Sequence, residues 1–251
     1  MEAPRTEIEL SEEIERLHAA LARHEQEADA KELQLERYAA DLRETFKQER
    51  ARAQELRRSY MDTVRALSNA VEARDAYTGK HAERVTAYGM ELARVIGPEL
   101  SEQSELEFGF LLHDIGKVAI PDAILYKPST LTEKERALMA QHPVIGAQIV
   151  RGIDFLAEAA KVVRSHHERW DGCGYPDRLA GEEIPLAARA FALADVLDAL
   201  TSERPYRPAS PLRVARAMIV RGSGAQFDPR MVDAFNEIDD ATFERIAAEI
   251  R

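Results

Sequence analysis

The sequence predicts an all-α protein: a helical bundle preceded by one long helix. Residues 5–78 contain neither glycine nor proline, and residues 7–58 are rich in Glu, Arg, Ala, Leu and Gln, which helices favour or tolerate. After Gly79, helical segments of roughly 10–20 residues are separated by prolines. No convincing strand pattern is present. We therefore expect a long charged helix over 1–62 and a compact domain over 63–251.

The long helix carries a heptad-like apolar seam that predicts a coiled coil. Its members are Leu10, Ile14, Leu17, Leu21, Ala28, Leu35, Tyr38 and Leu42. A second register, Tyr60, Val64, Leu67 and Val71, is offset from the first and indicates a stutter before the domain. Because a helix that is polar on most faces needs a partner to be stable, we expect a parallel dimer. The alternative is a solvated helix or one packed on its own domain.

Start signals and apolar spacing mark helices in the second part. Thr132 with Glu135 forms a capping-box pattern, and Ser210-Pro211 places a cap before a first-turn proline. These predict helices near 132–141 and 211–221. Apolar residues are also spaced helically over 106–112 and 187–200.

Composition limits the class of function. With 45 Asp and Glu against 34 Lys and Arg, the net charge of −11 opposes binding to polymeric nucleic acid, although local positive charge can still hold a small anion. The single cysteine, Cys173, excludes an intrachain disulfide and fits a reducing compartment. No long apolar stretch or signal core is evident, so we expect a cytoplasmic protein that binds no membrane.

Histidines and aspartates recur at intervals of roughly 24 to 32 residues, long enough for one helix and its connection. They are His81, His113, Asp114, His142, His166, His167 and Asp195. Nitrogen mixed with carboxylate donors suits iron, manganese or a similar divalent ion better than calcium. A lone buried histidine is more often structural, but seven such residues predict a two-metal centre. His18 and His24, on the charged helix, are interpreted as surface residues.

Two segments resemble the signatures of the HD-GYP family. They are His113-Asp114-Ile115-Gly116-Lys117 and His166-His167-Glu168-Arg169-Trp170-Asp171-Gly172-Cys173-Gly174-Tyr175-Pro176. The resemblance covers Val64 to about Phe235 and implies an all-helical HD-superfamily phosphodiesterase that hydrolyses cyclic di-GMP to pGpG or onward to GMP. It also implies docking to diguanylate cyclase domains. The first 60 residues lie outside it.

The resemblance assigns the ligands to two ions. One would be held by His81, His113, Asp114 and Asp195, and the other by Asp114, His142, His166 and His167. If the His113-Asp114 doublet lies on a helix, its side chains point about 100° apart and span a wide angle. A water activated by the two ions would attack phosphorus, with Asp114 central to catalysis.

Basic residues and one loop are candidates for substrate contact. The resemblance assigns Lys117 to phosphate contact or charge stabilisation, and Arg204 and Arg207 to holding a phosphate, which guanidinium groups suit. The glycine-rich segment 171–176 predicts a turn-rich loop that places Tyr175 against a guanine base or a partner protein. A purely structural loop and ordinary surface cations are the alternatives.

One position departs from the family pattern. Members that bind a third metal carry a glutamate four residues before the first histidine, and this chain has Tyr77 there. The departure favours two metals and pGpG as the main product. Two alternatives stay open: another cyclic dinucleotide such as cyclic GMP-AMP as substrate, or a receptor or interaction module with weak catalysis. The intact His113-Asp114 doublet argues against the second.

Overall fold

The chain folds into helices joined by turns and loops. The computed structural model describes residues 7–74, 80–103, 105–203 and 208–250. Within these ranges no strand is present, only an isolated bridge between Ser223 and Phe227. The prediction of an all-α fold with a long N-terminal helix is confirmed.

Twelve α-helices and three short 3-10 helices make up the described chain. In order they are α1 (Glu7–Glu72), α2 (His81–Ile96), α3 (Pro98–Ser101), α4 (Leu106–Leu111), η1 (Ile115–Ala119), α5 (Asp122–Leu125), α6 (Glu133–Met139), α7 (His142–Arg151), η2 (Asp154–Leu156), α8 (Ala159–Ser165), η3 (Gly181–Glu183), α9 (Leu186–Thr201), α10 (Leu212–Arg221), α11 (Pro229–Glu237) and α12 (Asp240–Glu249).

The chain divides into two compact units, residues 1–59 and 60–251. In the first unit the structure describes one element, the N-terminal part of α1. Its predicted seam, including Leu17, Leu21 and Leu42, is exposed in the single chain. This unit has no core of its own, so the described chain contains nothing that covers the seam.

The last turns of α1 are part of the second unit and pack on it through one face. Met61 and Val64 are buried, and the buried Ser68 hydroxyl donates a hydrogen bond to the Leu111 carbonyl at 2.8 Å. Leu67, a member of the second predicted register, is exposed. The face buried on the domain therefore follows the spacing 61, 64 and 68.

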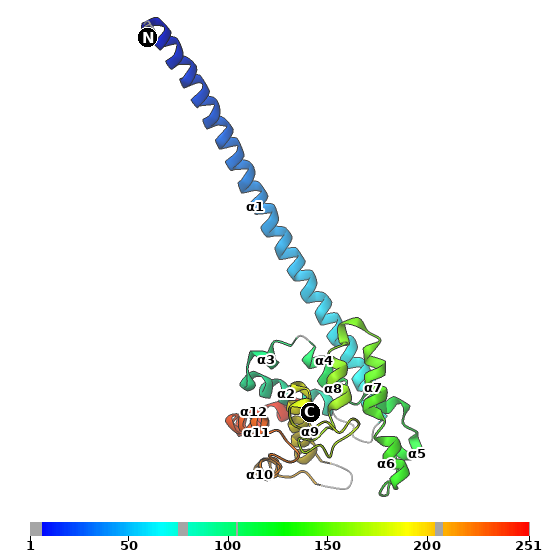
Figure 1. The fold of residues 1–251 in the computed structure, drawn as a ribbon. Helices are drawn as coiled ribbons and strands as arrows, with labels where there is room; N and C mark the ends of the chain where they lie inside the picture. The colour runs from blue at the N-terminus through cyan, green and yellow to red at the C-terminus, as the bar shows by residue number, and fades with distance from the viewer. Residues whose placement is uncertain (1–6, 75–79, 104, 204–207, 251) are drawn as a thin grey trace. The chain divides into compact units, whose positions relative to one another are not determined.

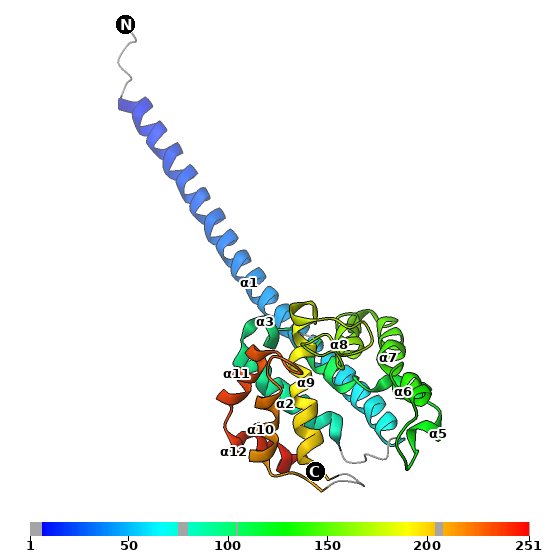
Figure 2. The same ribbon diagram turned by 60° about the horizontal axis from the view of Figure 1, so that its bottom comes forward.

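Two hydrophobic clusters form the interior of the second unit. The larger joins α2 and α9 to the C-terminal helices α10, α11 and α12, which lie on one side of the bundle in both views (Figures 1 and 2). The smaller joins the end of α1 to α4, α7 and α8. Phe110 and Phe191, both fully buried in the larger cluster, lie with ring centroids 5.2 Å apart and link α4 to α9.

The predicted helix starts were partly correct. Thr132 and Glu135 form a capping box at the start of α6, as expected. By contrast, α10 begins at Leu212 with Pro211 as its N-cap and without a side-chain cap, so Ser210 does not serve as the cap. The Pro211 carbonyl instead accepts hydrogen bonds from the Val214 and Ala215 N–H groups, at 2.8 and 3.2 Å.

A glycine brings η1 against the start of α7. A Cβ atom at Gly116 would collide with the His142 carbonyl oxygen and would lie 2.6 Å from the Gly146 nitrogen. Only a residue without a side chain allows the two backbones to approach so closely. This contact sets the distance between the turn that carries His113 and Asp114 and the helix that begins at His142.

We predict that Gly116→Ala lowers the free energy of unfolding by about 1–3 kcal/mol, because the added methyl group meets backbone that cannot move aside. Urea denaturation of the metal-free protein measures this. Gly152→Ala is the matched control, since a Cβ there would lie 3.5 Å from the Ile149 carbonyl, an ordinary contact. Its effect should stay within about 0.5 kcal/mol. Equal midpoints for the two variants would contradict the prediction.

Candidate metal centre

The seven predicted ligands come from the ends and middles of different elements. His81 is the first residue of α2, His142 is the first of α7, and His166 and His167 directly follow α8. Asp195 lies within α9, one turn before Asp198.

His113 and Asp114 lie in the turn between α4 and η1. The expectation that this doublet lies on a continuous helix, with side chains 100° apart, is therefore wrong. The turn interrupts the helix just before Gly116, which packs closely on the start of α7.

Six of the seven residues form two groups able to hold a metal ion. In each group one candidate ligand atom per residue lies within 4.8 Å of the others: His142, His166 and His167 in one, and His81, His113 and Asp114 in the other. The Asp114 carboxylate lies between the groups. Its Oδ2 is 3.2 Å from His113 Nε2, and its Oδ1 is 3.2 Å from His142 Nε2 and 4.0 Å from His166 Nε2.

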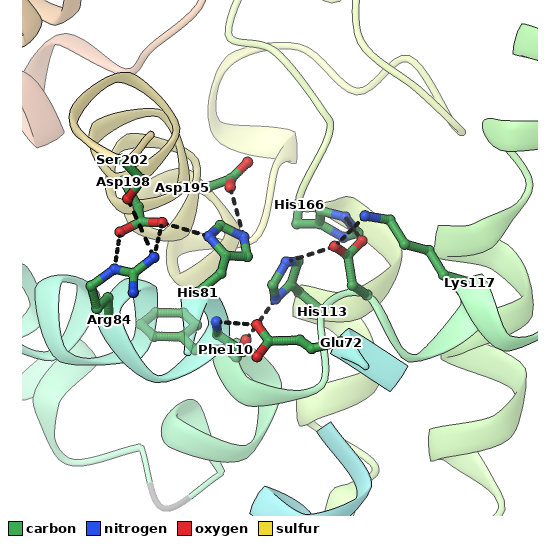
Figure 3. Close-up of polar contacts among 12 residues, drawn as sticks. Glu72, His81, Arg84, Phe110, His113, Lys117, His166, Asp195, Asp198 and Ser202 are labelled. Carbon is green, nitrogen blue, oxygen red and sulfur yellow. Dashed lines mark hydrogen bonds and ion pairs between the residues drawn. The ribbon is translucent and has the colours of Figure 1, made fainter. Parts of the chain in front are cut away.

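Asp195 joins the group that contains His81. Its Oδ1 lies 3.5 Å from His81 Nε2, and the carboxylate is partly exposed (Figure 3). All seven predicted ligands therefore lie in one region of the second unit.

Hydrogen bonds fix which ring nitrogen faces the centre. The Nδ1 atoms of His113, His142 and His166 lie 2.8–2.9 Å from the carbonyl oxygens of Phe110, Met139 and Val163, in each case three residues earlier in the chain. A carbonyl can only accept, so each Nδ1 carries the proton. In the neutral form of each ring, Nε2 then presents a lone pair to the centre.

This arrangement favours a bound cation. The Nε2 atoms of His142 and His166 lie 3.2 Å apart, and the hydrogen bonds at Nδ1 leave both without a proton. Two facing lone pairs repel each other in a buried site, and a cation shared between them removes that cost. The donor set of imidazoles and carboxylates fits a divalent transition metal.

The pKa values of the ligands agree with that fit. Burial would raise the pKa of Asp114, but Lys117 and His113 stabilise the carboxylate and hold the pKa well below its usual range. Burial lowers the pKa of His166 well below 6.5, and burial followed by the charge of His142 lowers that of His167 to about 4. At neutral pH the site thus offers an ionised carboxylate at Asp114 and neutral imidazoles at His166 and His167, the forms that bind metals.

Lys117 lies against the Asp114 carboxylate. Its Nζ is 2.7 Å from Asp114 Oδ2, and both side chains are largely buried. The residue belongs to the 3-10 helix η1, three positions after Asp114. Its ammonium group therefore lies at the edge of the centre, and its contact with a phosphate stays a prediction.

A cleft of about 230 Å³ opens beside the group formed by His142, His166 and His167. Its lining includes His167, Tyr175, Asp195 and Gln226. The Tyr175 ring lies 4.8 Å from the His167 ring, centroid to centroid, and burial raises the pKa of its hydroxyl. Tyr175 therefore forms a wall of the cleft.

Sequence reasoning missed two buried carboxylates that support the site. Glu168 accepts hydrogen bonds from the backbone N–H groups of residues 177, 178 and 179, at 2.7–3.2 Å. Asp198 accepts one from His81 Nδ1 at 2.7 Å. Glu168 directly follows the paired histidines, and Asp198 follows the predicted ligand Asp195 by three residues. The signal that could have revealed them was an acidic residue in an otherwise apolar or ligand-bearing stretch.

Three residues of the sequence prediction, Arg204, Arg207 and Tyr77, lie outside the described residues. Their predicted roles stay predictions.

Comparison with known proteins agrees with the site. Residues 65–231 match the HD domain family. The chain belongs to this family. The resemblance to HD-GYP proteins is also confirmed, because the HD-domain relatives that match include several cyclic di-GMP phosphodiesterases.

Three relatives show the range of the HD-domain proteins that this chain resembles. A cyclic di-GMP phosphodiesterase of Vibrio cholerae is 42% identical over 74% of this chain and 41% of its own length. A cyclic di-GMP phosphodiesterase response regulator of Xanthomonas campestris is 44% identical over 69% and 46%. A 3'3'-cGAMP-specific phosphodiesterase of Vibrio cholerae is 41% identical over 73% and 35%. The chain thus spans less than half the length of each.

A solved structure supports the HD-domain fold. The crystal structure of a cyclic GMP-AMP specific phosphodiesterase of Vibrio cholerae superposes with a TM-score of 0.53 and 23% identity, over 74% of this chain and 52% of that chain.

Among the described residues, no helix is both long and apolar enough to cross a membrane.

The pKa of His167 predicts how the metal-free protein responds to acid. The unfolded chain takes up a proton on this residue below about pH 6.5, but the folded protein does so only near pH 4. The stabilisation is therefore complete above pH 6.5 and is lost as the pH falls through this window, by on the order of 3 kcal/mol.

Urea denaturation of the metal-free protein between these pH values tests the prediction. His167→Gln should flatten the fall in unfolding free energy, whereas His24→Gln, on the exposed part of α1, should keep it. Identical pH dependence in wild type and His167→Gln would refute it.

Proposed function

We propose that this chain is a metal-dependent phosphodiesterase that hydrolyses cyclic di-GMP to pGpG in bacterial second-messenger signalling. The observation that carries the proposal is the Asp114 carboxylate lying between two groups of imidazoles whose Nε2 atoms converge on it. Relatives that share this domain act on cyclic dinucleotides, by their names. A buried array of unprotonated nitrogens around one carboxylate has little structural use without a cation.

The proposed centre holds two divalent ions, iron or manganese. His81, His113, Asp114 and Asp195 would hold one, and Asp114, His142, His166 and His167 the other. When bound, such ions would lower the pKa of a water molecule and neutralise charge on the phosphate oxygens. The absence of a glutamate at position 77 favours two ions, and hence pGpG as the main product.

Residues around the centre would bind and orient the nucleotide. Lys117 is close enough to Asp114 for its ammonium group to contact a phosphate held at the centre and to stabilise developing negative charge. Tyr175, on the wall of the cleft, would stack on a base or shape the site. Arg204 and Arg207 would hold a phosphate through their guanidinium groups.

We predict that anaerobic protein loaded with Fe(II) or Mn(II) binds about two ions per chain and hydrolyses cyclic di-GMP to pGpG. Asp114→Ala should lower turnover at least about a thousandfold, since it removes the residue shared by both groups. Asp233→Ala, an exposed aspartate on α11, is the matched control and should retain activity. Metal content and products are quantified together by elemental analysis and chromatography.

Competing substrates decide between related nucleotides. Because some relatives are named as 3'3'-cGAMP-specific, cyclic GMP-AMP is assayed beside cyclic di-GMP in one mixture. If cyclic GMP-AMP is hydrolysed in preference, the proposed substrate changes and the proposed reaction stands. Full metal occupancy and tight nucleotide binding without turnover of either would overturn the enzymatic proposal in favour of a receptor.

Two protein partners belong to the proposal. The exposed apolar seam of α1 supports a parallel homodimer, since leucines at heptad spacing gain free energy only when a second helix covers them. The loop 171–176 would dock a diguanylate cyclase domain, in line with the HD-GYP resemblance. Its exposed residues include Asp171 and Cys173.

We predict that deleting residues 1–58 converts a dimer into a monomer and leaves the metal content unchanged. Sedimentation equilibrium measures the mass, and elemental analysis the metal. A full-length variant with Leu17→Asp and Leu21→Asp should also be monomeric, because each charge would be buried in the seam. Glu12→Asp, on the same helix but off the seam, keeps the dimer. A truncated protein that still sediments as a dimer would disprove a dimer held by this helix.

A further inference from the structure

One histidine of the centre is oriented differently from the three others whose Nδ1 contacts are described above. His113, His142 and His166 each donate Nδ1–H to a backbone carbonyl three residues earlier. His81 is the first residue of α2, and its Nδ1 lies instead 2.7 Å from the Asp198 Oδ2 atom. Its ring orientation therefore depends on a side chain from another helix.

Asp198 is built firmly into the protein interior. Its exposed fraction is 1%, although it is an acidic residue. The Arg84 guanidinium, one turn after His81 on α2, donates to Asp198 Oδ1 at 2.6 Å and to Oδ2 at 3.1 Å. The same guanidinium also contacts the Ser202 hydroxyl at 3.2 Å (Figure 3). A buried carboxylate is tolerated only with such charge-assisted hydrogen bonds.

Two carboxylates of helix α9 thus flank His81, one beside each ring nitrogen. Asp195 approaches Nε2 at 3.5 Å, and Asp198, one turn later on the same helix, approaches Nδ1 at 2.7 Å (Figure 3). The Asp198 carboxylate can only accept a hydrogen bond, so Nδ1 carries the proton and, in the neutral ring, the lone pair of Nε2 faces Asp195 and the centre. A carboxylate in this position fixes the tautomer and the ring orientation of a metal-ligating histidine.

We infer that Asp198, held by Arg84, is a positioning residue that fixes the tautomer and orientation of His81 for metal binding. The inference rests on the proposed metal centre, in which His81 is a ligand. Arg84 spans both oxygens of Asp198, so it keeps the carboxylate from turning away from the imidazole. No backbone carbonyl takes this role for His81 in the described chain.

The wild-type protein provides the first test. Long-range ¹H–¹⁵N spectra of metal-free protein labelled at histidine, recorded near pH 8 where imidazoles are neutral, report which ring nitrogen carries the proton. The His81 signals are assigned by their loss in His81→Asn. We expect the proton on Nδ1. A proton on Nε2 overturns the inference without any Asp198 variant having to fold.

Asp198→Asn provides the second test. Its single amide oxygen would remain toward the Arg84 guanidinium, so its NH₂ would face His81 and force the proton onto Nε2, the tautomer that cannot bind the metal. We expect the affinity for one of the two ions, titrated as Mn(II), to fall about 10–100-fold, and the His81 signals to show the changed tautomer. The affinity for the other ion should stay within about threefold of wild type.

The matched control is Asp228→Asn, another buried aspartate paired with an arginine. Asp228 is 4% exposed and lies 2.8 Å from the Arg189 guanidinium. Its carboxylate also accepts a hydrogen bond from the Arg230 backbone N–H, and neither partner is a predicted ligand. It should lose comparable stability in urea yet keep both metal affinities and the His81 tautomer. Unchanged metal affinity in Asp198→Asn, or an equal loss in Asp228→Asn, overturns the inference. Neither the metal affinity nor the His81 tautomer is measured with nucleotide. A protein that fails to hydrolyse nucleotide would therefore count against the proposed function and not against this inference.

Discussion

The structure of the second unit depends on one arrangement, a buried carboxylate surrounded by imidazoles from separate elements. Asp114 lies within 3.2 Å of His113 and His142, and Lys117 adds a cation at 2.7 Å. Bringing these groups together requires a broken helix at residues 112–114 and a glycine at 116 that lets η1 lie on α7. The hydrophobic clusters supply the free energy that holds such polar groups out of water.

Helix ends provide the carbonyl groups that orient histidine rings at this centre. A histidine at the beginning or just beyond the end of a helix has nearby carbonyls without helical partners, and His142 and His166 use the carbonyl three residues earlier to orient their rings. The end of α1 supports the same region from outside: Ser68 bonds the Leu111 carbonyl, and the Glu72 carboxylate accepts from the Ala82 N–H at 2.5 Å. Both contacts lie within two residues of a predicted ligand.

The loop after the paired histidines is fixed from two directions. Glu168 is 4% exposed and accepts hydrogen bonds from the N–H groups of residues 177–179. Burial raises the pKa of its carboxyl group, and these hydrogen bonds oppose that effect. From the other side, the Trp170 and Asp171 N–H groups bond to the carbonyls of Gln226 and Ala225. Tyr175 is thereby held over His167 by backbone contacts on both flanks. A loop so constrained can present an aromatic ring to a ligand at little entropic cost.

The sequence could reveal helices and ligand types but not the contacts that orient them. Apolar spacing located α4 and α9 to within one residue, because burial on one face imposes a period. It could not reveal the break at His113 and Asp114, since the cause is the approach of α7, a segment distant in the chain. The role of Asp198 could not be predicted for the same reason. Its partners, His81 and Arg84, lie more than 110 residues earlier, and periodicity carries no information on such pairs. A buried acid on an apolar helix nevertheless demands a cation or donor, which is the physical reason to look for one.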